Sequence, residues 1–158
     1  MLSKILCTTV ILIIIAIIIL YLTRQTIPSQ IDFAQLKAST RPNWYLVCPA
    51  DLCPQAQAQS PVLNVSLTQL KQGWQQVIAA EYRITMLASN AEQTQMTYVQ
   101  RSPVMHFPDI INVKLIDLDD HHSTIAIYSA AIYGYSDNGV NQRRITLWLQ
   151  RLQENLAT

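Results

Sequence analysis

The sequence predicts an α+β fold: an N-terminal transmembrane helix followed by a two-layer domain, in which an antiparallel four- to five-stranded sheet carries two helices on one face. Three observations support this prediction. An uncharged apolar run lies near the N-terminus, two segments have the apolar spacing of amphipathic helices, and several short segments alternate apolar and polar residues as strands do. The order strand, helix, four strands, helix places both helices on the same face of the sheet.

The apolar run at residues 5–23 contains no charged residue and, at about 1.5 Å per residue, nearly matches the roughly 30 Å hydrocarbon core of a bilayer. No small-residue cleavage site follows it, which favours an uncleaved signal anchor over a cleaved signal peptide. The basic residues on its two sides are balanced, but the short tail before Lys4 favours export of the rest of the chain. We therefore expect a transmembrane helix in residues 1–23, a tether in residues 24–41 and an exported domain in residues 42–158, held at the inner (cytoplasmic) membrane.

Two cysteines lie outside the apolar run, in the segment CPADLC, whereas Cys7 lies inside it. In an exported domain, a pair such as Cys48 and Cys53 can close a small disulfide loop. Half of a metal site is the alternative, but no second pair of Cys or His occurs at zinc spacing. The sequence thus favours a disulfide and predicts neither a metal nor a cofactor.

The charge of the expected domain argues against one class of partner. After Arg41, nine acidic residues outnumber seven basic ones, so nucleic acid is not an expected partner. The expected partners are the lipid bilayer, through residues 5–23, and either an envelope protein or a small or lipidic ligand.

Two segments predict helices. Ser66 and Gln69 form a capping box, so the first helix should begin there and run to about Glu81. The apolar residues of each helix share one stripe, which would be buried on a flat surface. These residues are Leu67, Leu70, Trp74, Val77 and Ile78 in the first helix, and Ile145, Trp148, Leu149 and Leu152 in the second.

The strands supply that flat surface. Residues 43–48 alternate as a short strand, and residues 82–89 and 94–101 alternate on either side of a turn, which predicts a hairpin. Residues 111–118 and 123–133 follow as two further strands. The last of these has small or apolar residues on both faces, so we expect it at the centre of the sheet.

The segment YGYSDNGVNQRR, residues 133–144, connects the last strand to the second helix. Gly134 and Gly139 allow positive φ on both sides of its turn residues, and Ser136 lies between them. Either Asp137 or Asn141 can cap the helix that follows. These residues therefore predict a corner between the two elements.

Two arginines at the end of this corner need an additional explanation. Arg143 and Arg144 fall near the first turn of the helix, where positive charge opposes the helix dipole by a few tenths to about 1 kcal/mol each. Asp137 and Asp109 are internal partners that could offset this charge, and a bound anion is the external alternative. We favour the internal pairing because the acidic partners are already in the sequence.

The segment SAAIYGYSDNGVNQRR, with FPDIINVKL before it and CPADLC far upstream, resembles the domain-of-unknown-function family 1499 over residues 44–152. That family occurs in bacteria and plastids, commonly behind a membrane anchor or signal, and its hallmark resembles R-S-x-S-R-x-G-x-S-D-x-G-x-N-x-x-R. Where the family usually has two arginines, this chain has Tyr128 and Ile132. The resemblance implies a fold and a setting, but no activity. The matching residues are Ser129, Gly134, Ser136, Asp137, Gly139, Asn141 and Arg144.

Other polar residues suggest chemistry less strongly. His106 could act as a general base near Asp109, but a single histidine between apolar residues is more often packed. The segment DLDDHHS has metal-ligating side chains, yet neighbours in a tight turn point in different directions, so a solvated turn explains them. Its five candidate ligands are Asp117, Asp119, Asp120, His121 and His122.

The sequence therefore favours a non-enzymatic binding or structural module of the cell envelope. The alternative is an envelope enzyme, of a hydrolase-like kind, with a polar site around Asp137 that also uses His106 and the arginines. An open polar cleft beside Asp137 would favour the enzyme. A filled corner, with Asp137 bonded to backbone amides, would favour the binding or structural module.

Overall fold

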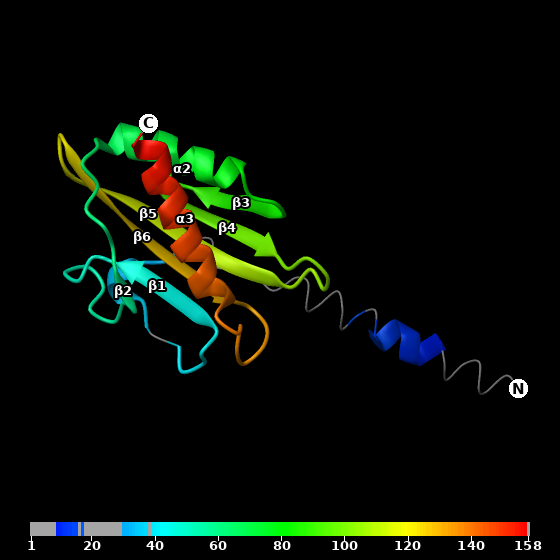
Figure 1. Ribbon diagram of the computed structural model, residues 1–158. Coiled ribbons are helices and arrows are strands. Elements are labelled where there is room, and N and C mark those ends of the chain that lie inside the picture. Colours follow the sequence, from blue (N-terminus) through cyan, green and yellow to red (C-terminus); the bar gives the residue numbers. More distant parts are fainter. Residues whose placement is uncertain (1–8, 16, 18–29, 38, 158) are drawn as a thin grey trace, which may run out of the picture.

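Six strands form one mixed sheet in the order β2–β1–β6–β5–β4–β3, with two α-helices on one of its faces (Figure 1). The structure is a computed structural model that describes residues 9–15, 17, 30–37 and 39–157. The elements of the domain are η1 (Phe33–Gln35), β1 (Trp44–Cys48), β2 (Ala58–Gln59), α2 (Leu67–Ala79), β3 (Ile84–Ser89), β4 (Gln95–Arg101), β5 (Pro108–Asp119), β6 (His122–Ala131) and α3 (Val140–Leu156).

The predicted transmembrane segment, residues 5–23, lies mostly outside the described residues. Within it, residues 9–15 and 17 are helical and exposed. Across the part of the chain that the structure describes, no helix has both the length and the apolar character needed to cross a membrane. The membrane anchor therefore stays a prediction.

The sheet has the predicted centre, because β6 lies between β1 and β5 and pairs with both in antiparallel orientation. The predicted hairpin of β3 and β4 is also confirmed. The sheet differs from the prediction at its edge, where β2 pairs with β1 in parallel orientation. Gln57 explains this extra strand, because its side-chain Oε1 accepts a hydrogen bond from the backbone N–H of Leu46 at 2.7 Å and its own N–H donates to the Leu46 carbonyl at 3.0 Å.

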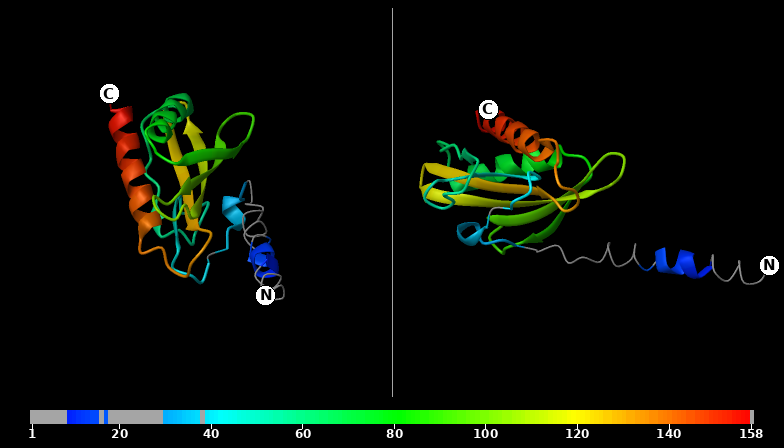
Figure 2. Two further views of the ribbon diagram at one scale, coloured as in Figure 1. Left: turned by 90° about the vertical axis from the view of Figure 1, so that its right-hand side faces the viewer. Right: turned by 90° about the horizontal axis from the view of Figure 1, so that it is seen from below.

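The main core lies between the sheet and the two helices, which cover the same face (Figure 2). The capping box of Ser66 and Gln69 is present at the start of α2, as predicted. Trp74 of α2 and Trp148 of α3 are both buried, and their ring centroids lie 5.7 Å apart at 72°. Trp74 Nε1 also donates to the hydroxyl of Tyr98 on β4 at 3.2 Å. These contacts fix the two helices to the sheet and to each other.

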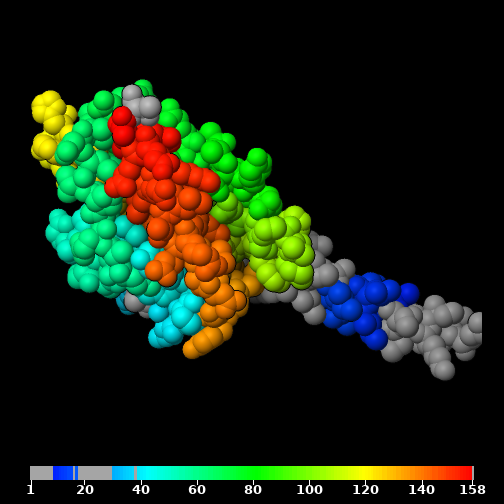
Figure 3. All heavy atoms as spheres, in the orientation of Figure 1, coloured from blue at the N-terminus to red at the C-terminus, as the bar shows by residue number. Residues whose placement is uncertain are grey.

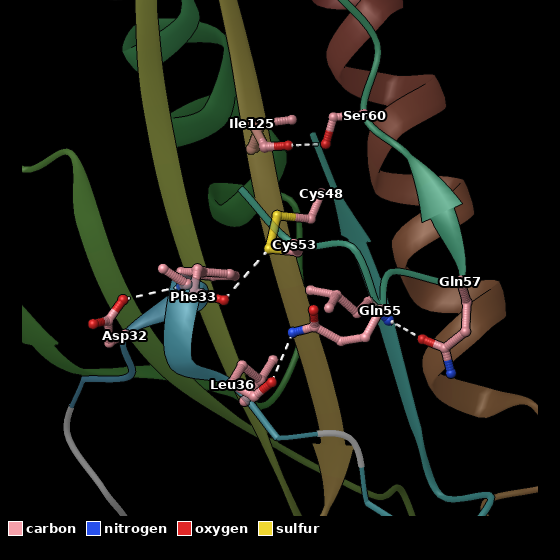
Figure 4. The surroundings of a disulfide bond; sticks show 11 residues. Asp32, Phe33, Leu36, Cys48, Cys53, Gln55, Gln57, Ser60 and Ile125 are labelled. Carbon is pink, nitrogen blue, oxygen red and sulfur yellow. Dashed lines mark hydrogen bonds between the residues drawn. A yellow bond between two sulfur atoms is a disulfide. The ribbon is translucent and has the colours of Figure 1, made fainter. Parts of the chain in front are cut away.

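A smaller core lies on the opposite face of the sheet, where Phe33, Leu46 and the cysteines pack together. The predicted disulfide is confirmed, with Cys48 and Cys53 bonded at 1.98 Å and fully buried (Figure 4). The Ile31 carbonyl accepts a hydrogen bond from Gln95 Nε2 at 2.8 Å. Residues 30–37, expected to be part of a tether, therefore pack as part of the domain because their apolar side chains cover this face.

Strand β5 begins at Pro108, three residues earlier than expected, so the break between β4 and β5 is confined to residues 102–107. A proline is tolerated at the first residue of a strand, where its missing N–H does little harm. The loop is closed by Ser102, whose backbone N–H donates to the Phe107 carbonyl at 2.9 Å. This early start brings Asp109 into the sheet beside the end of β6.

Candidate functional site: the polar corner between β6 and α3

The loop of residues 132–139 turns the chain from β6 into α3. Gly134 has φ 94° and Gly139 has φ 74°, values in the left-handed region that side chains rarely adopt. Gly139 is the residue that precedes the first helical position, and a Cβ on it would lie 3.1 Å from Arg143 Nη1. Both glycines are therefore needed for the turn itself.

Asp137 supplies the acceptors for the start of α3. Its Oδ1 accepts from the backbone N–H of Gly139 at 3.0 Å, and its Oδ2 accepts from the backbone N–H of Asn141 at 2.8 Å. Oδ2 also accepts from the side-chain Nδ2 of Asn141 at 2.7 Å. Of the two residues that could cap this helix, Asp137 is thus the one that binds its free N–H groups.

Asn141 has a different role, since its side chain is fully buried between the helix and the sheet. Its Nδ2 also donates to the Asn43 carbonyl at 3.1 Å, and its Oδ1 accepts from Ser129 Oγ at 2.5 Å. Asn43 in turn donates to the carbonyls of Ala131 and Gly134. Asn141 therefore connects α3 to β6 and to the residue just before β1.

Arg144 is the centre of this cluster, and its side chain is only 10% exposed. Its Nη2 lies 2.6 Å from Asp109 Oδ2, and its Nε donates to Gln100 Oε1 at 2.6 Å. Its Nη1 donates to Ser129 Oγ at 2.9 Å and to Asn141 Oδ1. One guanidinium thus joins α3 to β4, β5 and β6, and its charge is offset by Asp109, one of the two internal partners named from the sequence.

The neighbouring Arg143 is not equivalent to Arg144. It is exposed, and its Nη1 donates to the Asn138 carbonyl at 2.8 Å rather than to a carboxylate. Ser136 is also exposed, and its hydroxyl accepts from the Asn138 N–H at 3.2 Å. Both residues shape the loop from outside the buried cluster.

The corner is filled. Among the described residues, no buried side-chain nitrogen or oxygen lacks a hydrogen-bond partner. Cavities of about 380, 260 and 180 Å³ lie elsewhere, and neither Asp137 nor Arg144 lines any of them. The polar groups of the corner therefore bind each other rather than an open space.

Tyr128 and Ile132 stand where the family hallmark has arginines. Tyr128 faces the smaller core, with its ring centroid 6.0 Å from that of Trp44, and burial raises the pKa of its hydroxyl. Since side chains alternate along a strand, residue 128 points away from Ser129 and from the Arg144 cluster. The tyrosine therefore changes the opposite face of the sheet, not the corner.

The other candidates from the sequence do not form sites. Asp119 Oδ1 accepts from the backbone N–H groups of His121 and His122 at 2.8 Å each, and the carboxylate binds His122 Nδ1 at 2.8 Å. The backbone N–H of His121, and after it the His122 side chain, lower the pKa of Asp119. These bonds form a closed turn, and in the described residues no three His, Cys, Asp or Glu side chains are arranged so that they could hold a metal ion.

His106 lies in the loop of residues 102–107, apart from the corner cluster. It was expected to be packed, but it is exposed, with φ 54°. Its side chain makes no hydrogen bond with Asp109 in the described part of the chain, and Asp109 is bonded to Arg144 instead. The loop projects from the sheet, and for that reason the flanking apolar residues do not bury the imidazole.

An open groove of about 380 Å³ lies between β1, β2 and α3, and the sequence did not predict it. The surfaces of α3 and of the segment around β2 lie side by side there (Figure 3). In the sequence, only the many glutamines in PQAQAQSP and on the exposed side of the second helix could have indicated this groove. The two segments are distant in the sequence, and strand β2, which was not predicted, places the first of them at the edge of the sheet. Its lining includes Tyr45, Ala58, Gln59, Leu149, Gln150 and Gln153.

The fold and the corner define a class of protein: a two-layer α+β domain with a disulfide on one face of its sheet and a closed polar cluster on the other. The sequence model described as "Protein of unknown function (DUF1499)" matches residues 29–152, and the chain belongs to this family. No functionally curated protein matches the chain.

Proposed function

We propose that the protein is a single-pass membrane protein whose domain lies outside the cytoplasm and acts as a non-enzymatic binding module of the cell envelope. Its binding site is the groove between β1, β2 and α3, and the ligand is a small molecule without net charge. The polar corner is the joint that holds α3, one wall of this groove, against the sheet.

The composition of the groove is the observation that carries this proposal. Its lining consists of glutamine, serine and threonine side chains together with apolar ones, and Tyr45 is its one titratable residue. A volume of about 380 Å³ falls within the usual range for small-molecule sites. Such a lining can hydrogen-bond and bury a ligand, but it offers no carboxylate, histidine or cysteine for general acid–base or nucleophilic catalysis.

The state of Asp137 supports a non-enzymatic role over the hydrolase-like alternative. Its two oxygens already accept three N–H groups at the start of α3. To act on a substrate it would have to give up these bonds, with a cost to the helix start. The geometry therefore favours a structural role for Asp137 over a catalytic one.

The buried disulfide supports a location outside the cytoplasm. Disulfides persist in oxidising compartments and are rare in the reducing cytosol. Cys48 and Cys53 are both fully buried, and Cys53 packs beside Phe33, so the bond is part of the fold rather than an exposed redox site. A transmembrane anchor in residues 5–23 would hold such a domain at the membrane surface.

The test is native mass spectrometry of the full chain extracted in detergent from its own membrane. Thr146 is exposed and lines the groove, so Thr146→Trp should fill it at little cost in stability. Leu147 is the next residue of α3, is also exposed and does not line the groove, so Leu147→Trp is the matched control. We expect a co-purified mass with the wild type and with Leu147→Trp, and its loss with Thr146→Trp. A mass that persists in all three proteins, or its absence from all three, contradicts the proposed site.

A further inference from the structure

Two loops at one end of the domain expose apolar side chains next to each other. Val104 is 82% exposed, Met105 64% and Tyr135 71%. The ring centroids of Phe107 and Tyr133 lie 6.1 Å apart, which joins the loop of residues 102–107 to the corner loop. We call these five residues the apolar tip; its two loops project from the same end of the domain in Figure 1. Single exposed apolar residues are ordinary, but a contiguous group marks an interaction surface.

The exposed charges are divided between the two ends of the domain. Beside the apolar tip, the acidic groups are already occupied, since Asp109 binds Arg144 and Asp137 binds backbone N–H groups. The exposed cations at this end include Arg83, Arg101 and Arg143. The turns at the opposite end expose Glu92, Asp117, Asp119 and Asp120, partly offset by Lys71 and Lys114. The tip is therefore the positive end of the domain.

We propose that the apolar tip inserts into the interface of a bilayer, where Arg83, Arg101 and Arg143 bind the phosphates of anionic lipid headgroups. Aromatic side chains with an apolar body and a polar edge favour the headgroup level of a membrane, and cations favour an anionic leaflet. A protein partner would have to provide both the acidic groups and the apolar depth that an anionic bilayer presents together. This inference rests on the proposed function, because it takes the anchor in residues 5–23 to hold the domain at the same membrane.

The reach of the chain permits this arrangement. Gln95 at the start of β4 binds the Ile31 carbonyl, so the described domain begins near the end of β4 that is remote from the tip. Strand β4 extends over about 20 Å at its usual rise per residue. The chain from residue 23 to residue 30 can extend over at most about 25 Å. The segment can therefore span the length of β4, and the tip, which lies just beyond Arg101, can reach the bilayer that holds the anchor when the domain lies obliquely to it.

The test uses the full chain in lipid nanodiscs with Cys7→Ser, so that one introduced cysteine carries an environment-sensitive fluorophore. Met105→Cys places the fluorophore in the tip, and Leu118→Cys, also exposed and apolar, places it at the opposite end as the matched control. The discs contain either phosphatidylcholine alone or phosphatidylcholine with phosphatidylglycerol, each with a lipid-attached quencher. We expect several-fold stronger quenching at residue 105 than at residue 118, strongest in the anionic discs and reduced by added salt.

Each other outcome overturns the inference in a recognisable way. Equal, weak quenching at both positions in a chain that co-elutes with the discs rejects the membrane contact and leaves the anchor intact. A fluorophore at residue 105 that is shielded from water but not quenched by lipid indicates that a protein or a second copy of the chain covers the tip. A chain that does not co-elute with the discs rejects both the anchor and the tip contact.

Discussion

Arg144, just after the first turn of α3, lies 2.6 Å from Asp109 at the start of β5. The two residues are 35 positions apart in the sequence, and the ion pair joins the helix start to β5, which is not the strand immediately before α3. Ser129 and Asn141 complete the surroundings of the guanidinium. A cation near a helix N-terminus is unfavourable alone, and this pairing explains how the helix can carry it.

Replacing Arg144 should therefore be costly. Arg144→Met removes the charge and leaves Asp109 and Gln100 without the guanidinium as donor in a largely buried place, so we expect the free energy of unfolding to fall by about 3 kcal/mol. The measurement is urea unfolding of the full chain in a mild detergent. Arg143→Met is the control, because Arg143 is exposed and makes one bond to a carbonyl, and it should change the stability by less than about 1 kcal/mol. Equal losses from the two variants would show that the cluster does not support the fold.

Removal of the disulfide should weaken the fold without abolishing it. Replacing both Cys48 and Cys53 with Ala opens a short loop, so the free energy of unfolding should fall by about 2 kcal/mol. In the wild type, alkylation after denaturation without reductant should modify one thiol, that of Cys7, as counted by intact mass. Three modified thiols in protein prepared without reductant would contradict the bond.

Local patterns were sufficient to predict several elements of the fold. The start of α2 follows from a capping box, which acts within four residues, and the central place of β6 follows from small or apolar residues on both of its faces. Strand β2 and the packing of residues 30–37 were not predicted. Both depend on long-range contacts, such as Gln57 against β1 and Phe33 against the disulfide, that leave no periodic pattern in the sequence.

For the candidate site too, the sequence predicted some of the residues but not their long-range partners. The sequence singled out Asp137, Asn141 and Arg144. Polar residues at a helix start are expected to cap the helix, and a positive charge there is expected to have a partner that offsets it. The sequence did not indicate Gln100 or Asn43 as their partners. Strand register and chain topology decide which polar side chains reach the guanidinium and the Asn141 amide, and neither can be read from one segment.

The membrane topology remains a prediction with a direct test. The uncharged run in residues 5–23 and the short tail before it predict an uncleaved anchor with the C-terminal domain outside the cytoplasm. Alkaline phosphatase fused after Thr158 should be active, because it folds only where its disulfides can form, and β-galactosidase fused there should be inactive. The reverse pattern would place the domain in the cytoplasm.

Two buried tyrosines should make the domain sensitive to alkali. Desolvation by burial raises the pKa of Tyr98 and of Tyr128 above the usual 10.0, with the Trp74 hydrogen bond lowering that of Tyr98 as a smaller effect. Below pH 10 both groups are neutral in the folded and unfolded chain. Above it the unfolded chain loses its protons first, so stability falls as the pH rises toward the folded-state pKa values.

Tyr128→Phe should reduce this loss of stability at high pH and leave the stability at neutral pH nearly unchanged, because the Tyr128 hydroxyl makes no hydrogen bond within the described residues. Tyr98→Phe should cost about 1 kcal/mol at neutral pH, since it removes the acceptor of Trp74. Urea unfolding at several pH values measures both, and tyrosinate absorbance follows the titration. Identical alkaline profiles for the wild type and Tyr128→Phe would exclude a part for this hydroxyl.

The last prediction concerns Asp137 and decides between a joint and an anion site. Asp137→Ala removes three hydrogen bonds at the start of α3, so we expect a loss of about 1–3 kcal/mol in the free energy of unfolding, unaffected by phosphate. If the corner instead binds an anion, Asp137 repels the ligand, and its removal should cost little and strengthen phosphate binding. Thermal unfolding of the wild type, Asp137→Ala and Asp137→Asn, each with and without phosphate, distinguishes the joint from the anion site.

The measurement requires the full chain, because Phe33 packs beside the disulfide and belongs to the fold. Asp137→Asn keeps one carbonyl acceptor and should lose less than Asp137→Ala. An unchanged midpoint in Asp137→Ala that rises with phosphate would mean that the corner is an anion-binding site.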